Sequence, residues 1–211
     1  MEMPDTTEPQ AVQAVELCAA MESIHRRGWC DGTGGNFSCV INRDPVLLLM
    51  APSGVDKGSV RPGDLIVVDD QCRVREGKGK ASAETKLHLA IVDATEAGAV
   101  LHTHSQAATL LSLQQEDVVV EGLEMLKGLE GITTHACRVS IPVLENDQDL
   151  ERLSARAKPL LANAPHGLLI CGHGLYAWGK DLASARRHLE ILEFLLEQTW
   201  RGLVLNAIKN Q

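Results

Sequence analysis

Two histidines separated by a single residue, in the segment His102-Thr103-His104, directly follow the apolar run 99–101. Along a β-strand, residues i and i+2 project to the same side, so both imidazoles can converge on one point while Thr103 faces away. A third candidate, His173, lies between two glycines, which allow backbone and metal to approach closely. Three histidines leave one position open on a tetrahedral zinc ion, as catalytic sites require. The pattern therefore predicts one zinc ion per subunit.

A His-x-His pair alone is also explained by two ordinary core or surface histidines. The Gly-His-Gly segment after a second apolar strand favours the metal interpretation. The other histidines lack such a setting and are expected on helix faces or in loops, with His135 kept as a candidate pocket residue; they are His25, His88, His135, His166 and His188.

The elements that must position these groups follow from hydrophobic periodicity and turn residues. Helices are expected over 11–27, from near Ser82, which could cap its helix, and from near Asp181 past Trp200. Strands are expected at 37–41, 46–50, 65–68, 99–101, 139–144, 168–171 and 175–178. Because several strands follow one another without a helix between them, a mixed, mostly antiparallel sheet between helices is favoured over a βαβ barrel.

The length of 211 residues fits one domain, expected over 11–211, after a flexible N-terminal arm over 1–10. A net charge of -8 and 3% aromatic residues argue against nucleic-acid binding. Six scattered cysteines without a Cys-x-x-Cys pair are expected to be free thiols of a reducing compartment. The chain has neither a signal-peptide pattern nor an apolar run long enough to span a membrane. A cytoplasmic protein without membrane or nucleic-acid partners is expected.

Six short motifs stand in one order along the chain and resemble the class II aldolase/adducin family. They are Gly-Thr-Gly-Gly-Asn-Phe-Ser (32–38), Ala-Pro-Ser-Gly (51–54), Pro-Gly-Asp-Leu (62–65), Ser-Ala-Glu-Thr (82–85), His-Thr-His-Ser (102–105) and Gly-His-Gly-Leu-Tyr (172–176). The resemblance covers the chain from about Ala11 to Leu205. It implies a three-layer α/β/α domain, a homotetramer with sites near subunit boundaries, and a small phosphorylated ketose as substrate.

Within that family, the segments 122–129 (Gly-Leu-Glu-Met-Leu-Lys-Gly-Leu) and 141–149 look like those of sugar-phosphate dehydratases. The resemblance implies that Glu124 is the catalytic acid/base. An aldolase remains an alternative, because Glu84 matches the acid/base glutamate of the family's aldolases. Those aldolases also use a tyrosine from another stretch of chain, and the only tyrosine here is Tyr176. A non-catalytic scaffold like the adducin heads is the third alternative, which intact metal histidines disfavour.

A phosphate group is expected at the glycine turn, because oriented N–H groups in such turns bind anions without a net charge. The candidate substrate- and phosphate-binding residues lie in this turn, in the next two motifs and beside Glu124: Thr33, Gly34, Asn36, Ser53, Gly54, Ser82, Glu84 and Lys127. Lys127 is the candidate cation, and an ordinary solvated lysine is the alternative there. A purely structural loop would explain the glycine turn equally well.

Overall fold

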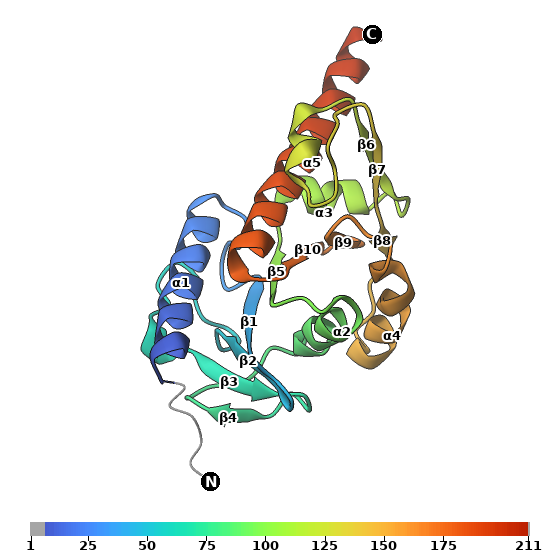
Figure 1. The fold of residues 1–211 in the computed structure, drawn as a ribbon. Helices are drawn as coiled ribbons and strands as arrows, with labels where there is room; N and C mark the ends of the chain where they lie inside the picture. Colours follow the sequence, from blue (N-terminus) through green and yellow to red (C-terminus); the bar gives the residue numbers. More distant parts are fainter. Residues whose placement is uncertain (1–6, 211) are drawn as a thin grey trace.

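The computed structural model describes residues 7–210, and its centre is an eight-stranded sheet with the order β4-β3-β2-β1-β5-β10-β9-β8 (Figure 1). All neighbouring strands are antiparallel except β8 and β9. The strands are β1 (Asn36–Arg43), β2 (Val46–Met50), β3 (Ile66–Asp69), β4 (Val74–Glu76), β5 (Ala99–Thr103), β8 (Val143–Leu144), β9 (Gly167–Ile170) and β10 (Gly174–Gly179). The mixed, mostly antiparallel sheet is confirmed.

Helices cover both faces of this sheet, which makes the predicted three layers (Figure 1). One face packs against α1 (Thr7–Arg26), α3 (Gln106–Ser112) and α5 (Leu182–Lys209). The other packs against α2 (Thr85–Thr95) and α4 (Leu150–Leu161). A separate ribbon consists of β6 (Val118–Glu121) and β7 (Arg138–Ile141), and two 3-10 turns complete the chain: η1 (Pro62–Asp64) and η2 (Glu124–Gly128). No helix in residues 7–210 is long and apolar enough to cross a membrane.

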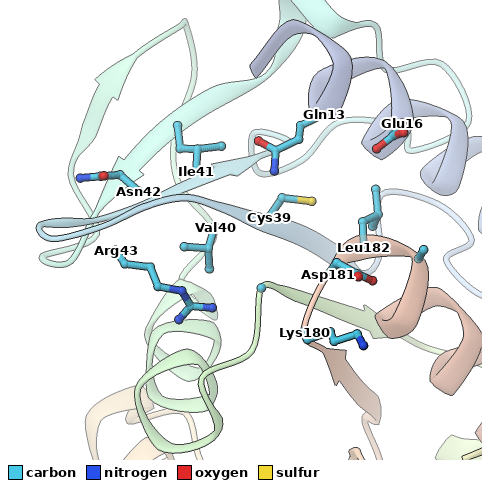
Figure 2. A pocket seen from close by; sticks show the side chains of 12 residues that line it. Gln13, Glu16, Cys39, Val40, Ile41, Asn42, Arg43, Lys180, Asp181 and Leu182 are labelled. Carbon is cyan, nitrogen blue, oxygen red and sulfur yellow. The ribbon is translucent and has the colours of Figure 1, made fainter. Parts of the chain in front are cut away.

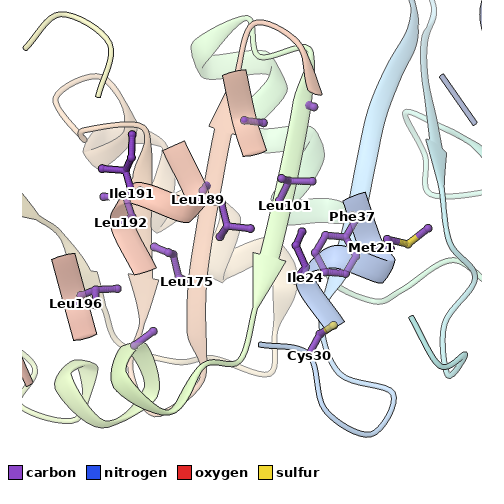
Figure 3. Close-up of a cluster of buried hydrophobic side chains, with 14 of the residues drawn as sticks. Met21, Ile24, Cys30, Phe37, Leu101, Leu175, Leu189, Ile191, Leu192 and Leu196 are labelled. Carbon is purple, nitrogen blue, oxygen red and sulfur yellow. The ribbon is translucent and has the colours of Figure 1, made fainter. Parts of the chain in front are cut away.

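The alternation of side chains along β5 divides the core into two parts. Leu101 points toward α1 and α5, where it packs with Phe37 and Leu175 (Figure 3). Val100 points the other way, into the cluster of α2 and α4 together with Trp178. Fully burying a side chain of this size stabilises the fold by about 1.5–3 kcal/mol. By the same alternation, His102 faces α2 and Thr103 faces α5.

Several boundaries differ from the expectations. The first helix begins at Thr7, so residues 7–10 are helical rather than part of the predicted arm, whose other residues lie outside the described ones. Ser82 does not cap α2; a turn precedes the helix, and Glu84 is its N-cap residue. The strand expected over 139–144 is two strands, because Pro142 interrupts it and β8 joins the large sheet beside β9.

Four elements were not expected: β4, β6, α3 and α4. Both helices begin at side-chain caps that the sequence contains. Ser105 accepts a hydrogen bond from the Ala108 amide, and Asp149 accepts two from the first turn of α4. All six cysteines are free, and burial raises the pKa of Cys30 to about 11, so this thiol stays protonated at neutral pH.

Candidate metal centre

The three predicted histidines converge with their Nε2 atoms facing one another. The distances are 2.8 Å between His102 and His104, 3.1 Å between His104 and His173, and 3.3 Å between His102 and His173. Nitrogens bound about 2.0–2.1 Å from a tetrahedral zinc ion are about 3.3 Å apart. The spacing and the donor chemistry therefore fit a bound metal ion.

His102 is held in the tautomer that a metal requires. Its Nδ1 lies 3.0 Å from the carbonyl oxygen of Leu175 and, because a carbonyl can only accept, must carry the proton. The Nε2 of the neutral ring then carries a free lone pair, which points toward the other two histidines. The ring also stacks on Tyr176 at a centroid distance of 3.9 Å. Burial holds the pKa of His102 well below its usual value, so the ring is neutral at pH 7.

The other two histidines are fixed through their backbones. The amide of His104 donates to the carbonyl of Trp29 at 2.7 Å, and a Cβ on Gly34 would lie 2.9 Å from the His104 ring. The carbonyl of His173 accepts a hydrogen bond from Thr109 of α3 at 2.9 Å. Gly174, next in the chain, packs so closely that an added Cβ would lie 2.0 Å from the Thr103 carbonyl oxygen. The glycines flanking these ligands therefore permit contacts that no larger residue could make.

Glu84 is the carboxylate of this cluster. Its Oε1 lies 3.0 Å from Nε2 of His173 and 3.7 Å from Nε2 of His102, and its other oxygen accepts a short hydrogen bond from Asn36. Burial acts to raise its pKa, but the hydrogen bond with His173 and the electrostatic effect of the neighbouring histidine rings outweigh it. The pKa lies well below the usual range, so Glu84 is ionised and can serve as a further ligand or as a base.

The glycine turn lies beside the histidines, but one expected donor in this turn and one in the 51–54 motif are engaged. The amide of Gly34 donates to the Asp31 carbonyl at 3.1 Å, and that of Ser53 donates to the Lys80 carbonyl at 2.8 Å. The side chains of Thr33 and Ser53 are exposed and that of Ser82 is half-buried. The hydroxyls of Thr33 and Ser53 are therefore accessible, whereas the amides of Gly34 and Ser53 are bonded within the chain.

Lys57 is a cation near the centre that the sequence analysis missed. It is 2% exposed, and its ammonium group donates to the carbonyls of Thr33 (3.1 Å) and Val55 (2.9 Å). Burial lowers its pKa, while Glu84 is among the charges that oppose this shift. Lys57 thereby ties the glycine turn to the following loop. The Asp-Lys-Gly at 56–58 had no feature that distinguished it from a solvated turn.

The predicted acid/base residue forms a second cluster with two other candidates. Glu124 lies in η2 in an ion pair with Lys127, and His135 Nδ1 is 3.7 Å from its other oxygen. All three side chains are exposed, and the hydrogen bond from Lys127 lowers the pKa of Glu124. Within residues 7–210, its carboxylate makes no ion pair with the three metal-site histidines. Glu124 is paired instead with Lys127, which neutralises its charge rather than standing as a free cation.

A cavity of about 530 Å³ lies at the opposite end of the sheet, near Gly98 and Lys180 (Figure 2). Arg43 lines it, and this guanidinium donates to the carbonyls of Glu96 and Ala97. None of the predicted site residues lines this cavity.

His88 of α2 is a buried histidine that interacts electrostatically with Glu84. Its titration makes the free energy of unfolding depend on pH. His88 is fully buried, and its Nδ1 lies 2.8 Å from Ser38 Oγ. Burial, opposed by Glu84, lowers its pKa from 6.5 to about 4. Between these values the unfolded chain binds the additional proton, so the stabilisation is present above pH 6.5 and is lost as pH falls toward 4.

We expect this titration to lower the free energy of unfolding by about 3 kcal/mol between pH 7 and pH 4. Urea unfolding of the wild type and of His88→Asn, which can keep the bond to Ser38, should be followed from pH 7 to pH 4. The variant is less stable at pH 7, but its free energy of unfolding should fall by about 3 kcal/mol less over this range. Parallel pH profiles would contradict the assignment.

Comparison with known proteins shows which family the chain resembles over most of its length. The profile of the family described as Class II Aldolase and Adducin N-terminal domain matches residues 15–200. A methylthioribulose-1-phosphate dehydratase of Methylococcus capsulatus is 44% identical over 189 residues, which cover 88% of this chain and 91% of that protein. The enzyme of the same name from Serratia proteamaculans is 44% identical over 206 residues, covering 95% and 99%.

Solved structures show the same fold at lower identity. An L-fuculose 1-phosphate aldolase superposes with a TM-score of 0.76 at 23% identity, covering 92% of this chain and 87% of that one. The L-fuculose-1-phosphate aldolase of Thermus thermophilus gives a TM-score of 0.74 at 22% identity, covering 93% and 98%.

Proposed function

The chain belongs to the class II aldolase and adducin family, and we propose that within it the protein is a methylthioribulose-1-phosphate dehydratase of methionine salvage. The reaction would remove water from 5-methylthioribulose 1-phosphate and give 2,3-diketo-5-methylthiopentyl 1-phosphate. The observation that carries this proposal is the 44% identity to dehydratases of that name over nearly the full length of both chains. The convergent histidines agree with it, since a scaffold would have no need of them.

We assign His102, His104 and His173 as ligands of one zinc ion per subunit. The three Nε2 atoms fit that ion in number and spacing; Leu175 holds the ring of His102, and Trp29 and Thr109 hold the backbones of His104 and His173. When bound, a divalent metal supplies Lewis-acid stabilisation of the negative charge that develops on the carbonyl oxygen of the ketose. Glu84 either completes the ligand set or holds a proton beside it.

Glu124 is our candidate for moving the proton. Dehydration requires a base to remove the C3 proton and an acid to protonate the C4 hydroxyl as it leaves. A single carboxylate can do both in turn, since it becomes the acid once it has taken the proton. The lowered pKa of Glu124 supplies the ionised form with which the cycle begins.

Because Glu124 is exposed and makes no ion pair with the metal-site histidines in residues 7–210, we propose that it serves the metal centre of a neighbouring subunit. A homotetramer with sites at subunit boundaries, located in the cytoplasm, would meet this requirement. The substrate phosphate would meet the hydroxyls of Thr33, Ser53 and Ser82, with Asn36 and the backbone at Gly34 and Gly54 nearby. Lys127 would accompany Glu124 across the boundary.

Glu84 favours an aldolase as the second candidate, because it is the carboxylate that lies beside His173 in this chain. Tyr176 speaks against it. The tyrosine is fully buried beneath His102, and burial, together with the nearby Glu84 carboxylate, raises the pKa of its hydroxyl well above the usual value. A side chain in that setting is poorly suited to donate a proton to a bound sugar phosphate.

Mass spectrometry of the product separates these alternatives. The zinc-loaded protein should convert 5-methylthioribulose 1-phosphate to a product that has lost one water and kept its carbon skeleton. Chelation of the metal should lower the rate at least about 100-fold, and added zinc should restore it. Two shorter fragments, one of them a triose phosphate, would indicate the aldolase. No turnover by zinc-loaded protein would refute the proposed substrate.

A further inference from the structure

Glu193 of α5 is a buried carboxyl group that the proposed reaction does not use. It is 2% exposed and lies on the face of the sheet opposite the metal-site histidines. Its Oε1 accepts a hydrogen bond from Thr103 Oγ1 at 2.5 Å, and the nearby Ser105 hydroxyl stabilises its charged form. A buried carboxyl group costs stability unless it is well hydrogen-bonded, so its presence here requires a reason.

The reason lies in the alternation of the His-Thr-His-Ser segment. His102 and His104 face one another across 2.8 Å, while Thr103 between them projects toward α5. Ser105 also accepts a hydrogen bond from the Ala108 amide, so it fixes the start of α3 as well. Thr103 and Ser105, which alternate with the two histidines, therefore both lie beside one carboxyl group, and Thr103 is hydrogen-bonded to it.

We propose that Glu193 is a positioning residue of the metal centre, which fixes the spacing of His102 and His104 by holding Thr103 and Ser105 from the back of β5. This inference rests on the proposed metal centre and concerns its geometry rather than its substrate. The helix that carries Glu193 is the longest in the described chain and is anchored in the core by Leu189, Leu192 and Leu196. It is thus a rigid support for the strand end.

The environment of the carboxyl group is consistent with a positioning role for Glu193. Burial raises the pKa of Glu193 to about 7, while the Ser105 and Thr103 hydroxyls act in the opposite direction by stabilising the charged form. Replacing a buried charged group by a well-packed apolar one is often neutral or stabilising for a protein, so stability alone does not explain a carboxyl group here. Its contacts with the two hydroxyls indicate that it orients the strand end that carries the ligands, as residues behind metal ligands commonly do.

The test measures metal binding directly. Glu193→Gln keeps the size of the side chain but replaces one acceptor oxygen by an NH2 donor, so a hydroxyl that donated to this oxygen must reorient and the geometry of the contact changes. We expect zinc affinity, determined by competition with a chromophoric chelator, to fall about 10–100-fold, the usual effect of changing an outer-shell partner. The visible absorption bands of the cobalt-substituted protein should shift, because they report ligand geometry. Glu197→Gln, one turn later on the same helix, removes a surface pair with Arg201 and should leave both readouts unchanged.

A pair of variants at Thr103 keeps the inference testable even if the Glu193→Gln variant does not fold. Thr103→Val removes the hydroxyl at constant shape and should weaken zinc binding as Glu193→Gln does, whereas Thr103→Ser keeps the hydroxyl and should bind zinc within about threefold of the wild type. Combining Thr103→Val with Glu193→Gln should add little, because both changes remove one interaction. In the metal-free protein, Glu193→Gln should speed hydrogen exchange at the His104 amide, which is bonded to Trp29.

The outcomes separate this inference from the proposed function. Unchanged zinc affinity and cobalt spectra in folded Glu193→Gln and Thr103→Val would overturn it while leaving the metal centre intact. A wild type that binds no metal would refute the metal centre and this inference with it. Dehydratase activity plays no part in these measurements, so an incorrect substrate would affect neither.

Discussion

Replacing His102 by alanine is expected to abolish metal binding and to lower turnover at least about 1,000-fold. Three ligands hold the proposed ion, and His102 alone is fully buried, stacked on Tyr176 and bonded to Leu175. Its loss leaves two nitrogens, too few to hold zinc in a stable site. Zinc content of the purified variant, measured by mass spectrometry, should fall from one ion per chain to less than about 0.1.

His25→Ala is the matched control. His25 is half-buried on α1 near Asp56, and within residues 7–210 it does not belong to the histidine cluster of the metal site. This variant should keep its zinc and its activity. That result would show that zinc is lost because His102 in particular is removed, and not because a histidine is removed. A His102→Ala protein that is folded and holds one zinc ion per chain would refute the proposed ligand set. Far-UV circular dichroism should accompany the zinc measurement, because the substitution leaves space in the core.

Replacing Glu124 by glutamine is expected to lower kcat about 100- to 10,000-fold while zinc content stays unchanged, because general acid–base catalysis contributes rate factors of this size. Glu124 touches none of the metal-site histidines in its own chain and is exposed, so the variant should fold like the wild type. Steady-state kinetics of metal-loaded protein give the result. Glu121→Gln, an exposed glutamate on β6, is the control and should retain activity.

Mixing two inactive variants tests whether Glu124 acts across a subunit boundary. In a homotetramer reassembled from equal amounts of Glu124→Gln and His102→Ala chains, about one site in four combines an intact histidine set with an intact Glu124 from its neighbour. Activity should therefore recover to about a quarter of the wild-type value. A reassembled mixture that stays inactive would contradict action across the boundary, and full activity of Glu124→Gln would transfer the acid/base role to Glu84.

Much of the fold was predictable because it follows from local patterns. The strands at 46–50 and 175–178 and the last helix were expected within a few residues of their observed bounds, since each is a continuous apolar or periodic run. The short elements were missed for an equally physical reason. The helix α3 has seven residues, and its cap at Ser105 was the one local signal that it offered.

The candidate site divides in the same way. The pairing of His102 with His104 follows from strand alternation alone, and the sequence motif sufficed to predict it. Glu84 was identified by family resemblance, but its place beside His173 depends on the turn that precedes α2. Lys57 carried no local signal at all, because its burial is created by the packing of the glycine turn over it.

The sequence by itself determined the donor types, the ordering of the motifs and the strand that carries two ligands, because these properties are local along the chain. Only the tertiary structure decided which distant residues meet. Pairing of β5 with β10 brings His173 to His102 across 71 positions, and docking of α5 sets Glu193 behind Thr103 across 90. The structure also paired Glu124 with Lys127 and His135 rather than with the metal-site histidines. Such contacts depend on sheet register and helix packing, which no short segment encodes.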